Sequence, residues 1–205
     1  MNHNNPESVE RAKKIKLFLM DVDGVLTDGK MYYIPGKGEE MVEFKAFCSL
    51  DGIGLRLLNQ FDITTGVITG RESPGTEERA KNLGMGYAYQ GFLSKAEPLR
   101  QILAATGLKE ENVAYMGDDW TDIPVLKRAG LACSPANGQE EVKAVSHLVT
   151  DKEGGAGAVR EVCDFILKSQ GHWATMMGYV ESAHWPAIKK EPMKIVRESE
   201  QGGKK

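Results

Sequence analysis

The chain alternates short apolar runs with segments whose apolar residues recur at helical spacing. The apolar runs are 15–20, 62–69, 113–116 and 130–133, and the first three lead into Asp21, Gly70 and Gly117. Short uninterrupted apolar runs are typical of strands buried on both faces of a sheet. We therefore expect a central sheet whose strands end at polar or glycine positions.

The segments between these runs favour helices. Apolar residues at helical spacing occur near 55–61, 77–83, 96–103, 123–129 and 159–167. Alternating strands and helices predict an α/β Rossmann-like fold, a three-layer parallel sheet with helices on both faces. Right-handed crossovers place the carboxyl ends of the strands at one edge, where open α/β sheets bind ligands. The polar residues that follow the strands should therefore converge.

One stretch departs from this alternation and predicts an inserted β-hairpin at 29–47. Its two halves, 29–34 and 39–47, flank Pro35-Gly36-Lys37-Gly38, a typical turn sequence. The segments between the strand ends are too short for a large cap domain. We expect residues 1–14 to form a flexible N-terminal lead, 15–170 the main domain, and 171–205 a C-terminal extension.

Composition narrows the possible functions of these 205 residues. Lys and Arg total 26 against 29 Asp and Glu, a net charge of −3, whereas nucleic-acid-binding domains usually carry a basic surplus. No run reaches the roughly 20 apolar residues of a membrane span, and the N-terminus has no signal-peptide core. The three cysteines lack zinc-site spacing, which favours reduced thiols in a cytoplasmic protein without nucleic-acid or membrane partners.

Asp21 and Asp23 stand two positions apart, directly after the first predicted strand. An acidic turn is the simpler interpretation, because such turns are common. The place at a strand end favours chemistry instead. One carboxylate there can bind a hard cation or attack a phosphorus atom, and a second can protonate the leaving oxygen.

Two further segments offer groups that could hold an anion. Thr69 and Gly70 end the second strand and supply a hydroxyl and backbone N–H groups, although a plain strand-to-helix turn has the same sequence. Lys95 begins a predicted helix, where most lysines are simply solvated. An ammonium at that place could also stabilise the charge of a transferring phosphoryl group.

A second acidic segment follows the strand at 113–116 and contains Asp118, Asp119 and Asp122. Aspartates at a helix N-terminus can simply offset the helix dipole. Asp118, nearest the strand end, could instead complete a Mg²⁺ site. Both interpretations stay open on this segment alone.

Taken in order, these segments resemble the motifs of the haloacid dehalogenase superfamily of phosphohydrolases, from Lys16 to about Gln170. The resemblance implies that Asp21 is the nucleophile that becomes an aspartyl phosphate, and that Asp23 is the general acid and base. It also implies a Mg²⁺ cofactor held by the Asp21 carboxylate, the Asp23 backbone carbonyl and Asp118.

The same resemblance assigns the remaining polar residues. Thr69, Gly70 and Lys95 are expected to bind the phosphate, and Asp119 and Asp122 to support the metal site. Because Asp23 would have to be protonated in one step and ionised in the next, its neighbours would have to tune its acidity.

Within that superfamily the chain is similar to the capless tetrameric 3-deoxy-D-manno-octulosonate 8-phosphate phosphatases. The segments that carry the similarity are 21–29, 50–52, 68–71, 89–91, 111–115, 154–155 and 157–163. This similarity implies a role in lipopolysaccharide biosynthesis and a homotetramer in which hairpins matching 29–47 form a central barrel. One subunit would then cap the active site of the next.

Some residues depart from the pattern of that group. Leu50 stands where many relatives have a basic residue, and Ala156 where they have arginine, which leaves the contacts to a sugar-acid carboxylate open. Arg71 is expected to bind substrate and favours an eight-carbon sugar acid, since a related nine-carbon type has an acidic residue there. The extension after Gln170 is longer and more aromatic, and we interpret it as an additional oligomer contact.

The preferred hypothesis is a Mg²⁺-dependent phosphohydrolase acting on 3-deoxy-D-manno-octulosonate 8-phosphate. The alternatives are a phosphatase for a nine-carbon sugar-acid phosphate and a phosphatase-like subunit of a phenylphosphate carboxylase complex, with the aromatic extension as its docking segment. A non-catalytic interaction module is a further alternative. The joint presence of Asp21, Asp23, Thr69, Lys95 and Asp118 argues against it, because the fold alone does not require that combination.

Overall fold

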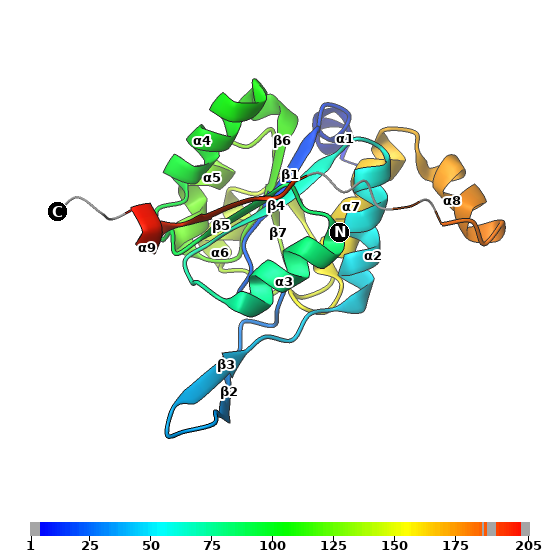
Figure 1. The fold of residues 1–205 in the computed structure, drawn as a ribbon. Helices are drawn as coiled ribbons and strands as arrows, with labels where there is room; N and C mark the ends of the chain where they lie inside the picture. The colour runs from blue at the N-terminus through cyan, green and yellow to red at the C-terminus, as the bar shows by residue number, and fades with distance from the viewer. Residues whose placement is uncertain (1–4, 186, 188–191, 202–205) are drawn as a thin grey trace.

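The computed structural model describes residues 5–185, 187 and 192–201. Within them, seven strands form a parallel sheet in the order β8-β7-β6-β1-β4-β5-β9, and two more pair as an antiparallel hairpin (Figure 1). The sheet strands are β1 (Leu17–Met20), β4 (Thr64–Thr69), β5 (Tyr87–Gln90), β6 (Val113–Met116), β7 (Leu131–Ser134), β8 (Leu148–Val149) and β9 (Lys194–Arg197). The hairpin strands are β2 (Tyr32–Pro35) and β3 (Met41–Phe44). The predicted α/β fold with an inserted hairpin is therefore confirmed.

Helices cover both faces of the sheet (Figure 1). One face carries α1 (Pro6–Ala12), α2 (Ser49–Gln60), α3 (Pro74–Leu83) and α7 (Ala158–Ser169). The other face carries α4 (Ala96–Thr106), α5 (Ile123–Leu126) and α6 (Glu140–Ala144). The remaining elements are α8 (Trp173–Glu181), α9 (Glu198–Gln201) and 3₁₀ turns at Glu110–Asn112 and Trp120–Asp122.

Strand β1 lies at the centre of the sheet and is buried on both sides. Phe18 and Met20 pack into the cluster that includes α2 and α7, whereas Leu17 and Leu19 pack into the cluster that includes α4 and α5. Successive side chains of a strand point to opposite faces, so a fully apolar strand fits between two helical layers. Because β1 pairs with β4 on one side and β6 on the other, the segments that follow these three strands emerge together.

Helix α1 corrects the expectation of a flexible lead at 1–14. The side chain of Asn5 accepts a hydrogen bond from the backbone N–H of Glu7 at 3.0 Å, and Pro6 occupies the first helical position. Both are start signals of a helix. The hydroxyl of Ser8 donates to the carbonyl oxygen of His147 at 2.9 Å. Residues 6–12 are therefore a docked part of the main domain.

The C-terminal extension also returns to the sheet. Lys194–Arg197 forms β9, which pairs in parallel with β5, and Met193 and Val196 pack against the two core clusters. The main domain therefore does not close near residue 170 as expected. The short apolar pair Ile195-Val196 between charged residues has too little periodicity to be recognised as a strand.

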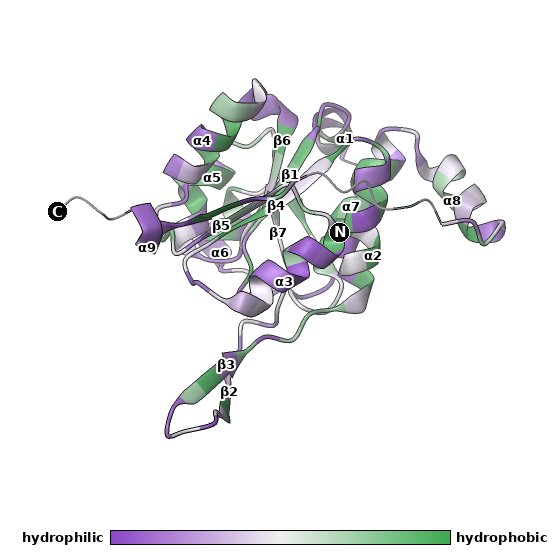
Figure 2. Ribbon diagram, viewed as in Figure 1, coloured by the Kyte–Doolittle hydropathy of each residue, from purple (hydrophilic) through white to green (hydrophobic). Residues whose placement is uncertain are grey.

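The hairpin projects away from the sheet (Figure 1), and parts of its ribbon carry the colour of hydrophobic residues (Figure 2). Its exposed large apolar residues are Met31, Tyr33, Ile34, Met41, Val42 and Phe44. Exposed apolar side chains gathered in this way are typical of interaction surfaces. Across the described part of the chain, we find no helix with the length and apolar character to cross a bilayer.

Candidate active site

The predicted site residues come from segments that meet at the carboxyl edge of the sheet. Asp21 directly follows β1, Thr69 ends β4, and Asp118 comes two positions after the last residue of β6. Lys95 immediately precedes α4, so the N-terminal end of this helix lies at the same edge. The topology therefore brings together residues that lie far apart along the chain.

A cavity of about 300 Å³ opens at this edge. Its lining residues are Asp21, Asp23, Gly29, Thr69, Gly70, Arg71, Leu93, Lys95, Asp118, Asp119 and Thr121. Apart from Asp122, every residue singled out from the sequence as catalytic, phosphate-binding, substrate-binding or metal-ligating lines this cavity. Asp122 lies beneath it and is fully buried.

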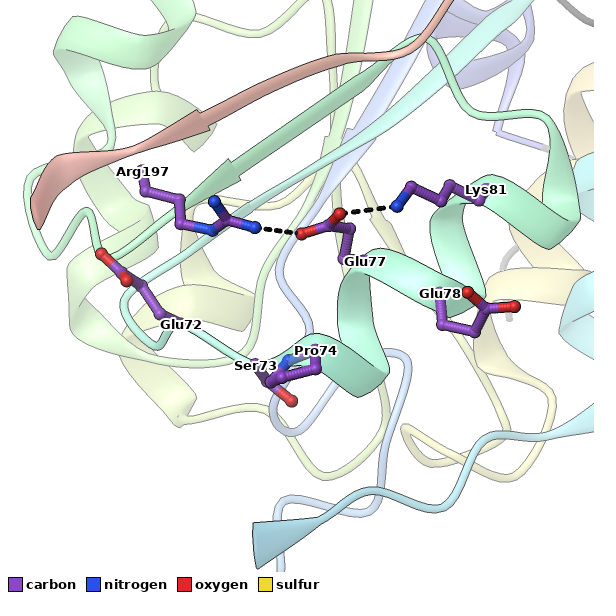
Figure 3. Close-up of a pocket in the computed structure, with 7 residues that line it drawn as sticks. All are labelled: Glu72, Ser73, Pro74, Glu77, Glu78, Lys81 and Arg197. Atoms are coloured by element: carbon purple, nitrogen blue, oxygen red, sulfur yellow. Dashed lines mark hydrogen bonds and ion pairs between the residues drawn. The ribbon is translucent and has the colours of Figure 1, made fainter. Parts of the chain in front are cut away.

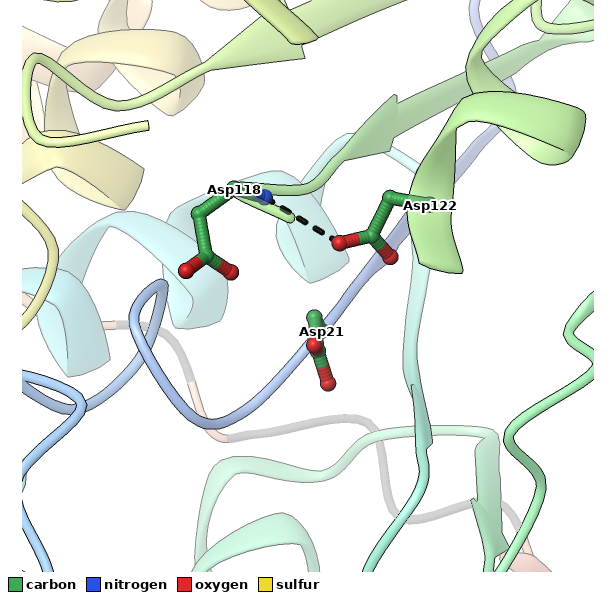
Figure 4. Close-up of side chains that lie close together, drawn as sticks. All are labelled: Asp21, Asp118 and Asp122. Atoms are coloured by element: carbon green, nitrogen blue, oxygen red, sulfur yellow. Dashed lines mark hydrogen bonds between the residues drawn. The ribbon is translucent and has the colours of Figure 1, made fainter. Parts of the chain in front are cut away.

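Asp21, Asp118 and Asp122 form an acidic cluster (Figure 4). Each contributes a carboxylate oxygen, and these atoms all lie within 4.8 Å of one another. The cluster contains Asp122, which was expected only to support the metal site, beside the expected ligands Asp21 and Asp118. The expectation for Asp23 concerned its backbone carbonyl, which the carboxylate geometry does not test.

The cluster fits a divalent cation. Oδ1 of Asp118 is buried and has no hydrogen-bond partner. When all three carboxyl groups are ionised, the neighbouring Lys95 ammonium offsets only one of the charges. Carboxylate oxygens are the ligands that Mg²⁺ prefers. Gly24 leaves room for this arrangement, since its φ is +90° and a Cβ at that position would collide with the Asp118 carboxylate.

Two aspartates of the cluster have raised pKa values, and burial is the largest cause of both shifts. Burial raises the pKa of Asp21 to about 6, although the nearby Lys95 ammonium opposes the shift. Burial also raises the pKa of Asp118 to about 8, and the charges of Asp21 and Asp122 add to the effect. A bound cation would reverse both shifts, because an opposite charge favours the ionised carboxylate.

Lys95 is held between two acids. Its Nζ lies 2.6 Å from Oδ2 of Asp21 and 2.6 Å from Oδ1 of Asp122, and its side chain is 1% exposed. Burial alone would lower the pKa of Lys95, but the charges of these two acids raise it overall. The ammonium is therefore retained and lies where a phosphoryl oxygen next to Asp21 could meet it.

Asp122 organises the loop that carries Asp118. Its Oδ1 accepts hydrogen bonds from Lys95 and from the Tyr115 hydroxyl, both at 2.6 Å. Its Oδ2 accepts from the backbone N–H groups of Asp118 at 3.1 Å and Asp119 at 3.2 Å. Because both of its carboxylate oxygens accept hydrogen bonds, Asp122 can hold Lys95 and the loop of Asp118 in place. Asp119 in turn caps the following 3₁₀ turn by accepting from the N–H of Trp120 at 2.7 Å.

Thr69 and Gly70 form the wall of the cavity at the end of β4. Thr69 is 2% exposed, and its hydroxyl accepts a hydrogen bond from the N–H of Arg71 at 3.4 Å. The Arg71 side chain is 44% exposed and reaches toward the hairpin. This wall offers an anion the hydroxyl of Thr69.

Asp23 makes contacts that the sequence did not reveal. Its Oδ1 lies 2.5 Å from Nζ of Lys45, which comes from the returning arm of the hairpin. Asp23 also forms a longer ion pair with Arg71, at 3.9 Å. Lys45 carried no local signal, because it follows an exposed strand and reaches Asp23 only through the orientation of the hairpin.

Asn137 is a second residue that the sequence analysis missed. Its Oδ1 accepts a hydrogen bond from the N–H of Gly154 at 2.8 Å, and its Nδ2 donates to the carbonyl oxygen of Gly24 at 3.4 Å. Gly154 packs so closely on Gly24 that a Cβ would collide with the backbone. Asn137 therefore joins the loop that carries Asp23 to the glycine-rich loop before α7.

A second cavity, of about 490 Å³, lies between α3 and β9 (Figure 3). Glu77 accepts hydrogen bonds from Lys81, at 2.6 Å, and from Arg197 of β9. The backbone N–H of Ser199 donates to Glu72 at 3.2 Å. These charged groups bind one another and fasten the C-terminal segment to α3.

Comparison with known proteins agrees with this geometry. The sequence profile of the haloacid dehalogenase-like hydrolases matches residues 84–162. The 3-deoxy-D-manno-octulosonate 8-phosphate phosphatase KdsC of Yersinia pestis is 43% identical over 162 residues, 79% of this chain and 84% of that protein. The chain belongs to this phosphatase family. The KdsC protein of Escherichia coli K12 is 40% identical over 163 residues, 80% of this chain and 85% of that protein.

A solved structure of the phosphatase family supports the same assignment. The 3-deoxy-D-manno-octulosonate 8-phosphate phosphatase of Moraxella catarrhalis, solved with magnesium, phosphate and KDO, superposes with a TM-score of 0.82. It is 41% identical and covers 86% of this chain and 99% of its own. The structural similarity therefore extends over most of this chain.

Proposed function

We propose that this protein is a Mg²⁺-dependent phosphohydrolase that releases phosphate from 3-deoxy-D-manno-octulosonate 8-phosphate. The observation that carries the proposal is the convergence of Asp21, Lys95 and Asp118 at one cavity from three distant chain segments. The relatives at about 40% identity support the substrate, since they bear the name of this activity.

The proposed reaction uses Asp21 as the nucleophile. A carboxylate oxygen of Asp21 forms a bond to phosphorus while the bond from phosphorus to the sugar oxygen breaks, and Asp23 donates a proton to that oxygen. Asp23 then accepts a proton from the water that hydrolyses the aspartyl phosphate. Lys95, at 2.6 Å from Asp21, would neutralise charge on the transferring phosphoryl group.

The metal assignment rests on the same acids. Asp21, the backbone carbonyl of Asp23 and Asp118 would hold Mg²⁺, and Asp119 and Asp122 would support them. When bound, Mg²⁺ neutralises the charge that would otherwise repel the phosphate from Asp21. Thr69, Gly70 and Lys95 are assigned to the phosphate, and Arg71 to the sugar acid.

We further propose a homotetramer in which a neighbouring subunit caps the active site. The exposed apolar residues of the hairpin support it, with Met41 at 60% and Tyr33 at 51% exposure. Burying such a patch between copies of the chain would remove apolar surface from water. A cytoplasmic location stays a prediction, supported by three cysteines that form no disulfide.

A substrate panel tests the proposal. Phosphate release is measured with and without Mg²⁺ from the eight-carbon sugar-acid phosphate, a nine-carbon analogue, a hexose phosphate and phenylphosphate. We expect the highest kcat/KM with the eight-carbon substrate, no turnover without the metal, and no turnover by Asp21→Asn. Faster turnover of phenylphosphate or of the nine-carbon analogue would replace the proposed substrate.

A further inference from the structure

The hairpin sends one charged side chain back into the active site. Lys45 directly follows β3, and its side chain is only 4% exposed although the strand before it faces solvent. Its Nζ lies 2.5 Å from Oδ1 of Asp23 and 3.3 Å from Oε1 of Glu43. A buried ammonium is stabilised only where such partners surround it.

These contacts belong to a closed ring of alternating charges. Glu43 binds Lys45 with one oxygen and Arg71 with the other. Arg71 completes the ring through Nε, which lies 3.9 Å from Oδ2 of Asp23. Burial would raise the pKa of Glu43, but Arg71 and Lys45 lower it overall, which favours an ionised Glu43 carboxylate between these two basic side chains. Two members come from the hairpin and two from the loops at the ends of β1 and β4.

The two carboxylate oxygens of Asp23 have different contacts. Oδ1 is bound by Lys45, whereas Oδ2 is buried without a hydrogen-bond partner. One oxygen of the carboxyl group is hydrogen-bonded, and the other has only the longer ion pair with Arg71, so Oδ2 is the oxygen assigned to proton transfer. The rotation of this carboxyl group is therefore set by a residue of the hairpin.

We propose that Lys45 is a positioning residue for Asp23, and that Glu43 holds Lys45 and Arg71 in the arrangement that the reaction requires. The proposal rests on the proposed function, in which Asp23 protonates the leaving oxygen. The hairpin then has two roles: its apolar surface faces outward, and its charged base completes the active site of its own chain.

The decisive experiment compares two substrates in the variant Lys45→Met. The alkoxide of a sugar needs a proton to leave, whereas 4-nitrophenolate does not. The ratio kcat/KM reports steps up to departure of the leaving group, so the later hydrolysis of the aspartyl phosphate does not affect it. We expect kcat/KM to fall roughly tenfold or more for the sugar-acid phosphate and less than about threefold for 4-nitrophenyl phosphate.

Matched variants separate positioning from anchoring. Lys45→Arg keeps the positive charge and should recover part of the loss with the sugar-acid phosphate. Lys37→Met makes the same chemical change at the tip of the hairpin, where the residue is exposed, and should leave the turnover of both substrates unaffected. Glu43→Gln keeps the shape of the ring and should lower kcat/KM for the sugar-acid phosphate more than for 4-nitrophenyl phosphate.

Three results would overturn the proposal. Equal losses for both substrates in Lys45→Met would indicate that Lys45 only anchors the hairpin. Wild-type kinetics in Lys45→Met would remove it from the reaction altogether. If Lys45→Met does not fold, as judged by circular dichroism, unchanged kinetics in Glu43→Gln would reject the ring. An inactive wild-type protein would instead contradict the proposed function, so the two failures are distinct.

Discussion

The Lys95 ammonium lies 2.6 Å from Oδ1 of Asp122, which is fully buried. The same ammonium lies 2.6 Å from the proposed nucleophile, Asp21. One cation is therefore shared by an acid exposed to the cavity and an acid beneath it. Movement of Lys95 toward a substrate would leave Asp122 without its charge partner, so Asp122 fixes the position from which Lys95 acts.

Loss of Asp122 should therefore destabilise the protein strongly. Asp122→Ala leaves the buried Lys95 ammonium with Asp21 but without Asp122, and it removes the acceptor of the Tyr115 hydroxyl and of the backbone N–H groups of Asp118 and Asp119. We expect the free energy of unfolding to fall by about 3–5 kcal/mol. Tyr115→Phe removes only one of these hydrogen bonds and should cost about 1 kcal/mol. Urea denaturation of both variants checks the difference, and equal losses would mean that Asp122 is not the centre of this network.

Magnesium should stabilise the folded protein through the acidic cluster. A ligand that binds only the folded state at 100 times its dissociation constant adds about 2.7 kcal/mol to stability. We expect Mg²⁺ to raise the Tm of the wild type, and Asp118→Asn to abolish the rise. Asp119→Asn should reduce the rise far less than Asp118→Asn does, since the Asp119 carboxylate caps Trp120 and lies outside the acidic cluster. A full Tm rise in Asp118→Asn would contradict the cation site.

Much of the fold follows from the sequence because the central strands are buried on both faces. A run such as 15–20 has no polar position, and this is the mark of a strand between two helical layers. The N-terminal helix and β9 were missed for different reasons. The first is a short, polar helix, so the start signal at Asn5 is not followed by a clear apolar periodicity. The second is a four-residue edge strand whose partner, β5, lies a hundred positions away.

For the site too, residues that follow strands could be predicted from the sequence, whereas residues placed by the orientation of distant segments could not. Asp21, Thr69 and Asp118 could be placed together because each follows a strand, and the topology of parallel sheets brings strand ends to one edge. Lys45 and Asn137 could not be found this way. Their contacts with Asp23 and Gly24 depend on how a hairpin and a loop are oriented, which no local pattern encodes.

Stability should depend on pH through Asp51. This residue is 1% exposed, and burial raises its pKa to about 6 while it accepts a hydrogen bond from the N–H of Arg160 at 2.8 Å. Between pH 4 and 6 the folded state keeps a proton that the unfolded state loses, so stability falls as pH rises through this window. Relative to Asp51→Asn, the wild type should lose about 3 kcal/mol across it. Urea denaturation at several pH values checks this, and parallel pH profiles would exclude Asp51 as the cause.

The exposed hairpin surface should govern assembly. Met41→Asp places a charge on the most exposed apolar side chain of the hairpin, and we expect it to reduce the molecular mass measured by light scattering. Because the proposed cap comes from a neighbouring subunit, KM for the sugar-acid phosphate should rise as well. Met41→Leu keeps the apolar surface and should leave the mass unchanged. A Met41→Asp protein of wild-type mass would place the subunit contact elsewhere.

Gly24 should be essential for the metal site rather than for folding. Its φ is +90°, and a Cβ would collide with the carboxylate of Asp118. Gly107 provides the control, because its φ is +70° but a Cβ there would meet nothing within 4 Å. Each alanine variant pays the backbone cost of a left-handed conformation, about 1–2 kcal/mol. Only Gly24→Ala should also lose the Tm rise with Mg²⁺ and the release of phosphate, because only there must Asp118 leave the acidic cluster. Retention of both properties in Gly24→Ala would show that the cluster does not require this close contact.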